Sequence, residues 1–177
     1  MRGAYASAPA AYPIREVNNM NLTTGKTYAF CILLAQAVGA LSAWVTREGV
    51  ERFNACVQKP PLTPPSAVFP VVWTILFALM GVGAARVALS PPSRQRQRAL
   101  ALFLLQLGAN FLWSVLFFNT GRYGLALLWL AVLWLLILAM LLAFRRVDRP
   151  AGWLQLPYLL WVAFAAYLNL GVWVLNR

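Results

Sequence analysis

The chain has 177 residues, of which 62% are hydrophobic and only 11% are charged, and its formal net charge is +11. A soluble domain carries about 25% charged residues, so this composition and the mean hydropathy of +0.68 exclude an ordinary soluble fold. The net charge alone is compatible with nucleic-acid binding. However, the basic residues lie between apolar segments and no RNA- or DNA-reading motif accompanies them, so we expect no nucleic-acid partner.

Five apolar segments are long enough to cross a membrane, since roughly 20 residues of helix span about 30 Å of hydrocarbon. They cover residues 27–46, 68–89, 99–118, 124–144 and 151–175. The sequence therefore predicts an all-α, integral membrane bundle of five transmembrane helices within residues 26–177. Residues 1–25 show no periodicity and are expected to form a disordered N-terminal extension. Met20 stands just before the first span and is an alternative start to Met1.

The first span carries Ala35, Gly39 and Ala43 at four-residue spacing. Small residues at that spacing let helix backbones approach closely. We weigh two interpretations equally: an ordinary contact within the chain, and the face of a homodimer.

The segment between the first two spans, residues 47–67, is the longest predicted loop. Proline fixes φ and lacks a backbone N–H, so residues 60–65, with four prolines, are predicted to be stiff and extended. Residues 48–57 are compatible with a short helical turn before them. We interpret the proline segment as a rigid lid that leads into the second span. Its lid residues are Lys59, Pro60, Pro64 and Pro65.

In both the second and the third span, large aromatic or polar side chains recur at helical spacing and therefore share one face. Trp73 and Phe77 share one face of the second span, and Gln106, Asn110 and Trp113 fall within a narrow sector of the third. An unpaired amide in hydrocarbon costs several kcal/mol, so both amides must face protein or a cavity. They are explained either by hydrogen bonds between helices or by a ligand pocket.

The last two spans differ in content. The fourth is almost purely Leu, Ala and Trp, which we interpret as lipid-facing packing. The fifth contains Pro157, which is expected to kink it. Beyond that point, Tyr158, Trp161, Ala165 and Asn169 share a face that forms either core or the wall of a pocket.

The residues of the spans offer little for acid–base or metal chemistry. The chain has no histidine, and its four acidic residues lie outside the spans. We therefore expect no metal site, no obligatory cofactor and no proton relay, and an enzyme is the less favoured class.

Ten of the fifteen Lys and Arg residues fall in the segments predicted to lie on the same side of the membrane as the N-terminus. The positive-inside rule then predicts a multi-pass protein with a cytoplasmic N-terminus and the first loop outside. This bias suits a bacterial inner membrane, with outer and organellar membranes as alternatives.

Several motifs in order along the chain are typical of one family. They are Lys59-Pro60, Thr63-Pro64-Pro65, Val68-Phe69-Pro70 and Val72-Trp73-Thr74, then Gln106, Asn110, Phe111 and Trp113, and finally Pro157-Tyr158 with Trp161, Ala165, Ala166, Tyr167, Leu168 and Asn169. With five spans, this pattern resembles the TspO/MBR family. These are the tryptophan-rich sensory proteins whose mitochondrial relatives are called translocator protein or peripheral-type benzodiazepine receptor.

The resemblance implies a bundle, often dimeric, that binds porphyrins and other hydrophobic ligands, sterol-like molecules included, in a pocket below the first loop. It implies tetrapyrrole transport or stress-linked regulation, with a porphyrin or haem-like tetrapyrrole as ligand. The family's pocket positions carry over to Trp73, Phe77, Asn110, Trp113, Trp161 and Ala165.

The first loop departs from the family pattern in its aromatic residues. Relatives usually have Trp-Tyr about six residues before the Lys-Pro pair and often a tryptophan two residues after it, where this chain has Phe53-Asn54 and Leu62. In the family the loop tryptophans are linked to light-dependent porphyrin breakdown. That activity is therefore an alternative function here, and a small bundle that acts through a protein partner is a further one.

Overall fold

The computed structural model describes the backbone of residues 14–177 and the side chains of residues 22–177. Its elements are α1 (Ile14–Cys56), α2 (Val68–Leu89), α3 (Arg94–Ser114), the π-helical segment η1 (Val115–Asn119), α4 (Tyr123–Val147), α5 (Arg149–Trp153) and α6 (Leu156–Leu175). No strand occurs in this part of the chain, and five of its helical stretches are long and apolar enough to cross a membrane. The prediction of an all-α membrane bundle is confirmed.

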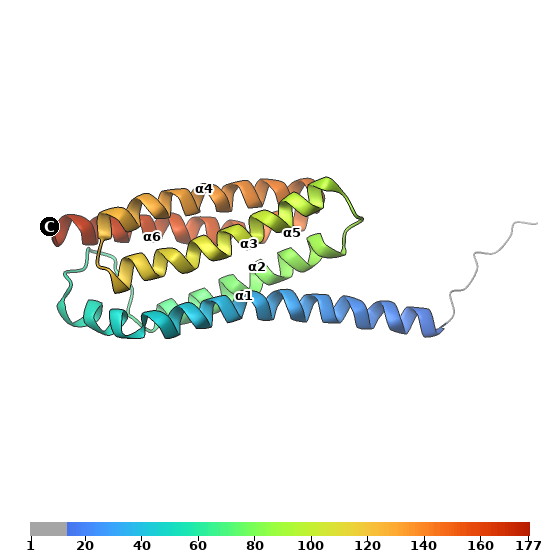
Figure 1. Cartoon of the computed structure of the whole chain (residues 1–177), viewed down its shortest axis with the longest axis horizontal. Coiled ribbons are helices and arrows are strands. Elements are labelled where there is room, and N and C mark those ends of the chain that lie inside the picture. Colours follow the sequence, from blue (N-terminus) through green and yellow to red (C-terminus); the bar gives the residue numbers. More distant parts are fainter. Residues whose placement is uncertain (1–13) are drawn as a thin grey trace, which may run out of the picture.

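The long helices run side by side along one axis (Figure 1). The loop after α1, the turn between η1 and α4, and the C-terminus lie at one end, and the α2–α3 and α4–α5 connections lie at the other. Closest packing is between α1 and α2, between α3 and α4, and between α4 and α6. By contrast, α6 makes few close backbone approaches to α2 or α3, which leaves room there for large side chains.

Helix α1 is longer at both ends than the predicted span. It begins at Ile14, so residues 14–25 are helical and the predicted disorder of the extension is wrong for them. The earlier part, with Met1, lies outside the described residues. At the other end the helix absorbs residues 47–56, which shortens the first loop to residues 57–67. The chain has no proline between Pro13 and Pro60, and extending an existing helix adds one hydrogen bond per residue without a new nucleation cost.

The ends of the third and fifth spans also differ from the prediction. Helix α3 begins five residues early because Ser93 caps it, accepting a hydrogen bond from the backbone N–H of Arg96 at 3.1 Å. The last predicted span is divided between α5 and α6. Pro157 lies in the first turn of α6 and offers no N–H to the carbonyl of Trp153, so the expected kink is a break at residues 154–155.

Helix α4 is central to the packing rather than a lipid-facing layer. It packs closely on both α3 and α6, and Leu133, Ile137, Met140 and Phe144 are fully buried. The interpretation of this span as lipid-facing packing is therefore wrong. Lipid tails and a helix core are equally apolar, so a helix built from Leu, Ala and Trp carries no polarity signal that separates its two faces.

Two glycines allow α1 and α2 to pack closely. A Cβ on Gly39 would collide with the ring of Phe77, and a Cβ on Gly81 would lie 2.5 Å from Cα of Ile32. Ala35 has no exposed surface, while Ala43 is exposed. The small-residue stripe thus makes an internal contact at Ala35 and Gly39, the first of the two interpretations, while the homodimer face stays a prediction.

An ion pair joins α2 to the α4–α5 connection. Arg86 donates from Nε to Oδ1 and from Nη2 to Oδ2 of Asp148, each at 3.0 Å, and the backbone N–H of Ala151 donates to Oδ1 at 2.7 Å. The pKa of the Asp148 carboxyl is held below its ordinary value, mainly by the hydrogen bonds from the Arg86 guanidinium and to a lesser extent by the Ala151 N–H.

We expect Asp148→Asn to reduce the stability of the folded protein by about 1 kcal/mol near pH 7, because Asn still caps α5 but carries no charge. The pKa of Asp148 is lower in the folded state. The contribution of ionised Asp148 to the stability of the folded protein is therefore complete above the ordinary carboxyl pKa of about 3.9. It is lost as pH falls through the lowered pKa of Asp148 in the folded state. Thermal unfolding in detergent from pH 7 to pH 2 measures this. The variant should show a flatter acid limb, and equal acid limbs would contradict the assignment.

Candidate functional site

The predicted ligand-binding residues lie where α6 stands apart from α2 and α3. Trp73 and Phe77 come from α2, Asn110 and Trp113 from α3, and Trp161 and Ala165 from α6. Phe77, Asn110 and Trp113 are buried, whereas Trp73, Trp161 and Ala165 are half-buried. Trp73 contacts Phe77, and both Trp73 and Asn110 contact Tyr158 of α6. That all six residues form one ligand-binding site stays a prediction.

Aromatic rings from α2 and α6 meet in this region. The ring of Trp73 lies 5.6 Å from that of Phe77 and 6.1 Å, edge to face, from that of Tyr158. The ring of Trp161 lies 6.0 Å from that of Phe69, at the start of α2. Such tilted and edge-to-face pairs are favourable, and each adds about 0.5–1.5 kcal/mol to simple burial. The aromatic side chains thus close the space between two helices whose backbones stay apart.

A buried chain of hydrogen bonds crosses the same space. The hydroxyl of Tyr158 donates to Oε1 of Gln106 at 3.0 Å and accepts from Nδ2 of Asn110 at 2.8 Å. Nε2 of Gln106 lies 3.5 Å from Sδ of Met80, so the chain continues to α2. Both amides of α3 therefore bond across helices, one of the two explanations that the sequence left open.

A second set of hydrogen bonds fixes Trp113. Its indole N–H donates to Oδ1 of Asn169 at 3.3 Å, and Nδ2 of Asn169 donates to the carbonyl of Tyr123 at 2.8 Å. The indole also stacks on Phe117, in the π-helical segment, at 5.5 Å. Trp113 is thus held from both sides, which makes it a rigid wall rather than a movable contact.

Three polar groups of the region have no hydrogen-bond partner among residues 22–177. They are the indole N–H groups of Trp73 and Trp161 and the amide oxygen of Asn110. An indole N–H donates and an amide oxygen accepts, so the region offers both kinds of group to a molecule bound between the helices.

The first loop, residues 57–67, runs along the outer half of α6 in the opposite direction. Gln58 exchanges two hydrogen bonds with the side chain of Asn176, at 3.0 and 2.9 Å. Further along, Pro60 is buried against Gly171, and the hydroxyl of Tyr167 donates to the carbonyl of Pro61 at 3.1 Å. These contacts follow one another in order, so the loop is fastened along the helix at three levels.

The predicted lid residues have distinct places in this loop. Lys59 donates to Oδ1 of Asn54 at 2.8 Å and lies over the ring of Phe53, while Pro60 is the buried anchor. Pro64 is half-buried, and the carbonyl of Pro65 accepts from the N–H of Val68, which begins α2. Leu62 lies at the exposed tip with φ of 65°, in the left-handed region that non-glycine residues rarely adopt.

The sequence missed several residues that hold the region together. Tyr158 was placed on the inward face, but nothing local shows that its hydroxyl bridges Gln106 and Asn110. Phe69 is named only within a family motif, and Gly171 and Asn176 are not selected at all. Prolines in a loop predict that it is stiff. They do not predict which helix the loop packs against, because that is decided by contacts between residues more than 100 positions apart.

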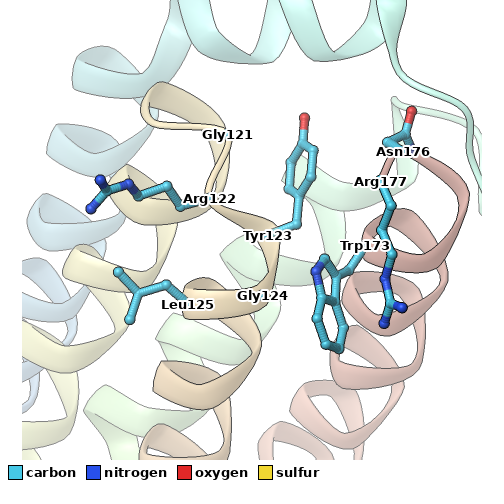
Figure 2. Close-up of a pocket in the computed structure, with 8 residues that line it drawn as sticks. All are labelled: Gly121, Arg122, Tyr123, Gly124, Leu125, Trp173, Asn176 and Arg177. Carbon is cyan, nitrogen blue, oxygen red and sulfur yellow. The ribbon is translucent and has the colours of Figure 1, made fainter.

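Two surface pockets lie at opposite ends of the bundle, and neither contains a predicted ligand-binding residue. One, of about 430 Å³, lies between the start of α4 and the end of α6, where Trp173 and Arg177 stand next to each other (Figure 2). The other, of about 580 Å³, lies at the α4–α5 connection. It is lined by Leu142, Arg145, Arg146, Arg149 and Trp153. The described residues contain no group of three His, Cys, Asp or Glu side chains that could hold a metal ion.

Residues 31–174 match the sequence profile of the TspO/MBR family. The chain is 38% identical over 156 residues to "Tryptophan-rich protein TspO" of Chlorobaculum tepidum, covering 85% of this chain and 96% of the relative. It is 42% identical over 120 residues to "Tryptophan-rich sensory protein" of Cereibacter sphaeroides, covering 68% and 74%. It is 35% identical over 144 residues to "Translocator protein" of Homo sapiens, covering 79% and 85%.

Proposed function

Because this chain belongs to the TspO/MBR family, a membrane family with receptor-like roles, we propose that it binds porphyrins and other hydrophobic ligands between α2, α3 and α6. The observation that carries the proposal is the space between α6 and its two neighbours, which large aromatic side chains fill instead of close backbone packing. The role of binding would be tetrapyrrole transport or stress-linked regulation.

Binding in this region would be non-covalent. A flat macrocycle has faces that stack on indole rings, and Trp73 and Trp161 are half-buried rings whose N–H groups are free to donate within residues 22–177. The free oxygen of Asn110 would accept from a ligand N–H. The existing ring contacts would have to open for the ligand, so a change in side-chain conformation at Trp73 is part of the proposal.

The first loop would control access from its end of the bundle. Its contacts with Tyr167, Gly171 and Asn176 of the α6 end hold it in place, and the exposed Arg52 nearby carries a charge that attracts porphyrin carboxylates. Lys59 is already engaged with Asn54 and Phe53, so its contribution to attraction would be smaller.

We expect the double variant Trp73→Ala, Trp161→Ala to bind protoporphyrin IX at least about tenfold more weakly, since two stacking faces are removed. Quenching of tryptophan fluorescence on titration in detergent micelles gives the dissociation constant. Trp44→Ala is the control, because Trp44 is 63% exposed on α1, away from the site. Non-saturable quenching of the unaltered protein, or equal affinities in the double variant and the control, would overturn the site.

Two other functions remain open to direct test. Light-dependent porphyrin breakdown would appear as loss of the Soret band on illumination of the complex, for which Trp73 and Trp161 are the oxidisable residues of the site. A bundle that acts only through a protein partner predicts no rise in thermal stability with porphyrin, whereas a ligand that binds only the folded state must raise it.

We also propose that the protein lies in a bacterial inner membrane with the first loop outside. Cys56 is exposed at the end of α1 next to this loop, and Cys31 is buried within the bundle. A membrane-impermeant maleimide applied to intact cells is therefore expected to label the protein once, and Cys56→Ser to abolish labelling. Labelling only after the cells are opened would reverse the orientation.

A further inference from the structure

We propose that the pocket at the α4–α5 connection binds the headgroup of an anionic phospholipid. It lies at the end of the bundle opposite the first loop and is separate from the region between α2, α3 and α6. Three arginines and one tryptophan supply most of its lining, around a volume of about 580 Å³.

The positive charge of this pocket is not balanced by protein carboxylates. Asp148 is the one acidic residue in the connection, and both of its oxygens are used by Arg86 of α2. Among residues 22–177, the other acids, Glu48 and Glu51, lie near the opposite end of the bundle on α1. Arg145, Arg146 and Arg149 therefore have no acidic partner in the described part of the chain.

One of these arginines is held in a fixed position. The guanidinium of Arg145 lies 4.5 Å from the ring centroid of Trp153, in a cation–π contact. Its backbone packs directly against Gly152, where a Cβ would lie 2.8 Å from the Arg145 nitrogen. Packing of α5 on the end of α4 thus orders Arg145. An arginine whose fork is already ordered loses less entropy when it binds a phosphate.

The apolar part of the pocket suits a lipid rather than a free ion. Leu142 is 44% exposed one turn deeper in α4, and Trp153 is 53% exposed beside it. Tryptophan prefers the membrane–water interface, where its ring contacts acyl chains and its N–H meets headgroups. Arginines near the end of a transmembrane helix are also favoured by its partial negative charge, but that effect needs no adjacent exposed tryptophan. The combination favours a phosphodiester headgroup with its acyl chains along Leu142.

The test uses the purified full chain and soluble dioctanoyl phosphatidylglycerol, with dioctanoyl phosphatidylcholine and glycerol 1-phosphate as parallel ligands. Native mass spectrometry counts bound lipid, and thermal unfolding gives the shift in stability. We expect phosphatidylglycerol to bind on the order of tenfold or more tightly than phosphatidylcholine. Glycerol 1-phosphate should bind negligibly, because it has no acyl chains to cover Leu142 and Trp153.

Two variants of equal charge separate this pocket from a general basic surface. Arg145→Gln with Arg149→Gln should lose most of the preference for phosphatidylglycerol, on the order of tenfold. Arg94→Gln with Arg98→Gln removes two exposed arginines at the same end, outside the pocket, and should retain the preference within about twofold. Trp153→Leu keeps an apolar surface but releases Arg145, so it should weaken phosphatidylglycerol binding without altering phosphatidylcholine binding.

Any of three results would overturn the proposal. They are equal binding of the two lipids, equal losses in the two arginine pairs, and tight binding of glycerol 1-phosphate, which would indicate a simple anion site. If the Arg145, Arg149 pair does not fold in zwitterionic detergent, the Trp153→Leu result decides, since that substitution leaves every charge in place.

Discussion

Gly81→Ala is expected to destabilise the protein by about 3 kcal/mol, although it adds only one methyl group. The new Cβ would lie 2.5 Å from Cα and 2.8 Å from the nitrogen of Ile32, and 2.9 Å from the carbonyl oxygen of Cys31. All three are backbone atoms of α1, so no side-chain rotation relieves the contact and the two helices must separate. In a membrane, close packing of this kind drives helix association, because lipid is as apolar as the helix surface.

Gly108→Ala is the matched control for this prediction. Gly108 lies within α3, and a Cβ built there meets no atom within 4 Å. Alanine has the higher helix propensity, so the control should be neutral or more stable by up to about 1 kcal/mol. Denaturant unfolding of both variants in micelles, followed by circular dichroism, compares them directly. Similar losses at the two positions would show that contact with α1 is not what determines the effect.

Tyr158→Phe should cost about 2 kcal/mol, since it removes one hydroxyl that serves two buried amides. Oε1 of Gln106 would lose its donor, and Nδ2 of Asn110 would lose its acceptor, in a region where neither side chain reaches solvent. The same substitution frees the Asn110 amide for a ligand. We therefore expect porphyrin affinity to be retained or increased while stability falls, and unfolding and fluorescence titrations measure the two effects separately.

The cause of the stability loss in Tyr158→Phe is tested by also replacing the two amides that lose their hydrogen bonds, Gln106 and Asn110. Adding Gln106→Leu and Asn110→Leu to Tyr158→Phe replaces the hydrogen-bonded chain by apolar groups of similar size, which should recover most of the stability. The triple variant should also bind porphyrin more weakly than Tyr158→Phe alone, because it lacks the Asn110 oxygen. No recovery in the triple variant would mean that packing around the Tyr158 ring, rather than the unsatisfied amides, controls the stability.

Most of the fold could be predicted because the membrane requires long, uninterrupted apolar helices. Helix α2 has the predicted bounds, 68–89, since Pro65 ends the loop before it and Pro91-Pro92 follow it. The prediction failed where apolarity was the only signal used. Polar residues at both ends of α1 are helical, and α4 hides a buried face that its composition does not reveal.

The candidate site could be predicted in part, for a related physical reason. Helical spacing depends on neighbours in sequence, so it placed Trp73 and Asn110 on inward faces, and both of them contact Tyr158. It does not show which hydroxyl an amide will reach on a helix 48 residues away, as Asn110 reaches Tyr158. Nor does it predict that the third span ends in the π-helical segment η1.

The fastening of the first loop to α6 has a consequence for the order of synthesis. Gln58 and Asn176 are 118 residues apart, and Pro61 and Tyr167 are 106 apart, so these bonds can form only once much or all of α6 has been made. Domains are built from the N-terminus during translation, and contacts distant in sequence form late. The nascent chain therefore inserts with this side of the bundle unclosed. At the proposed ligand site, a molecule that arrives before α6 would contact α2 and α3 alone.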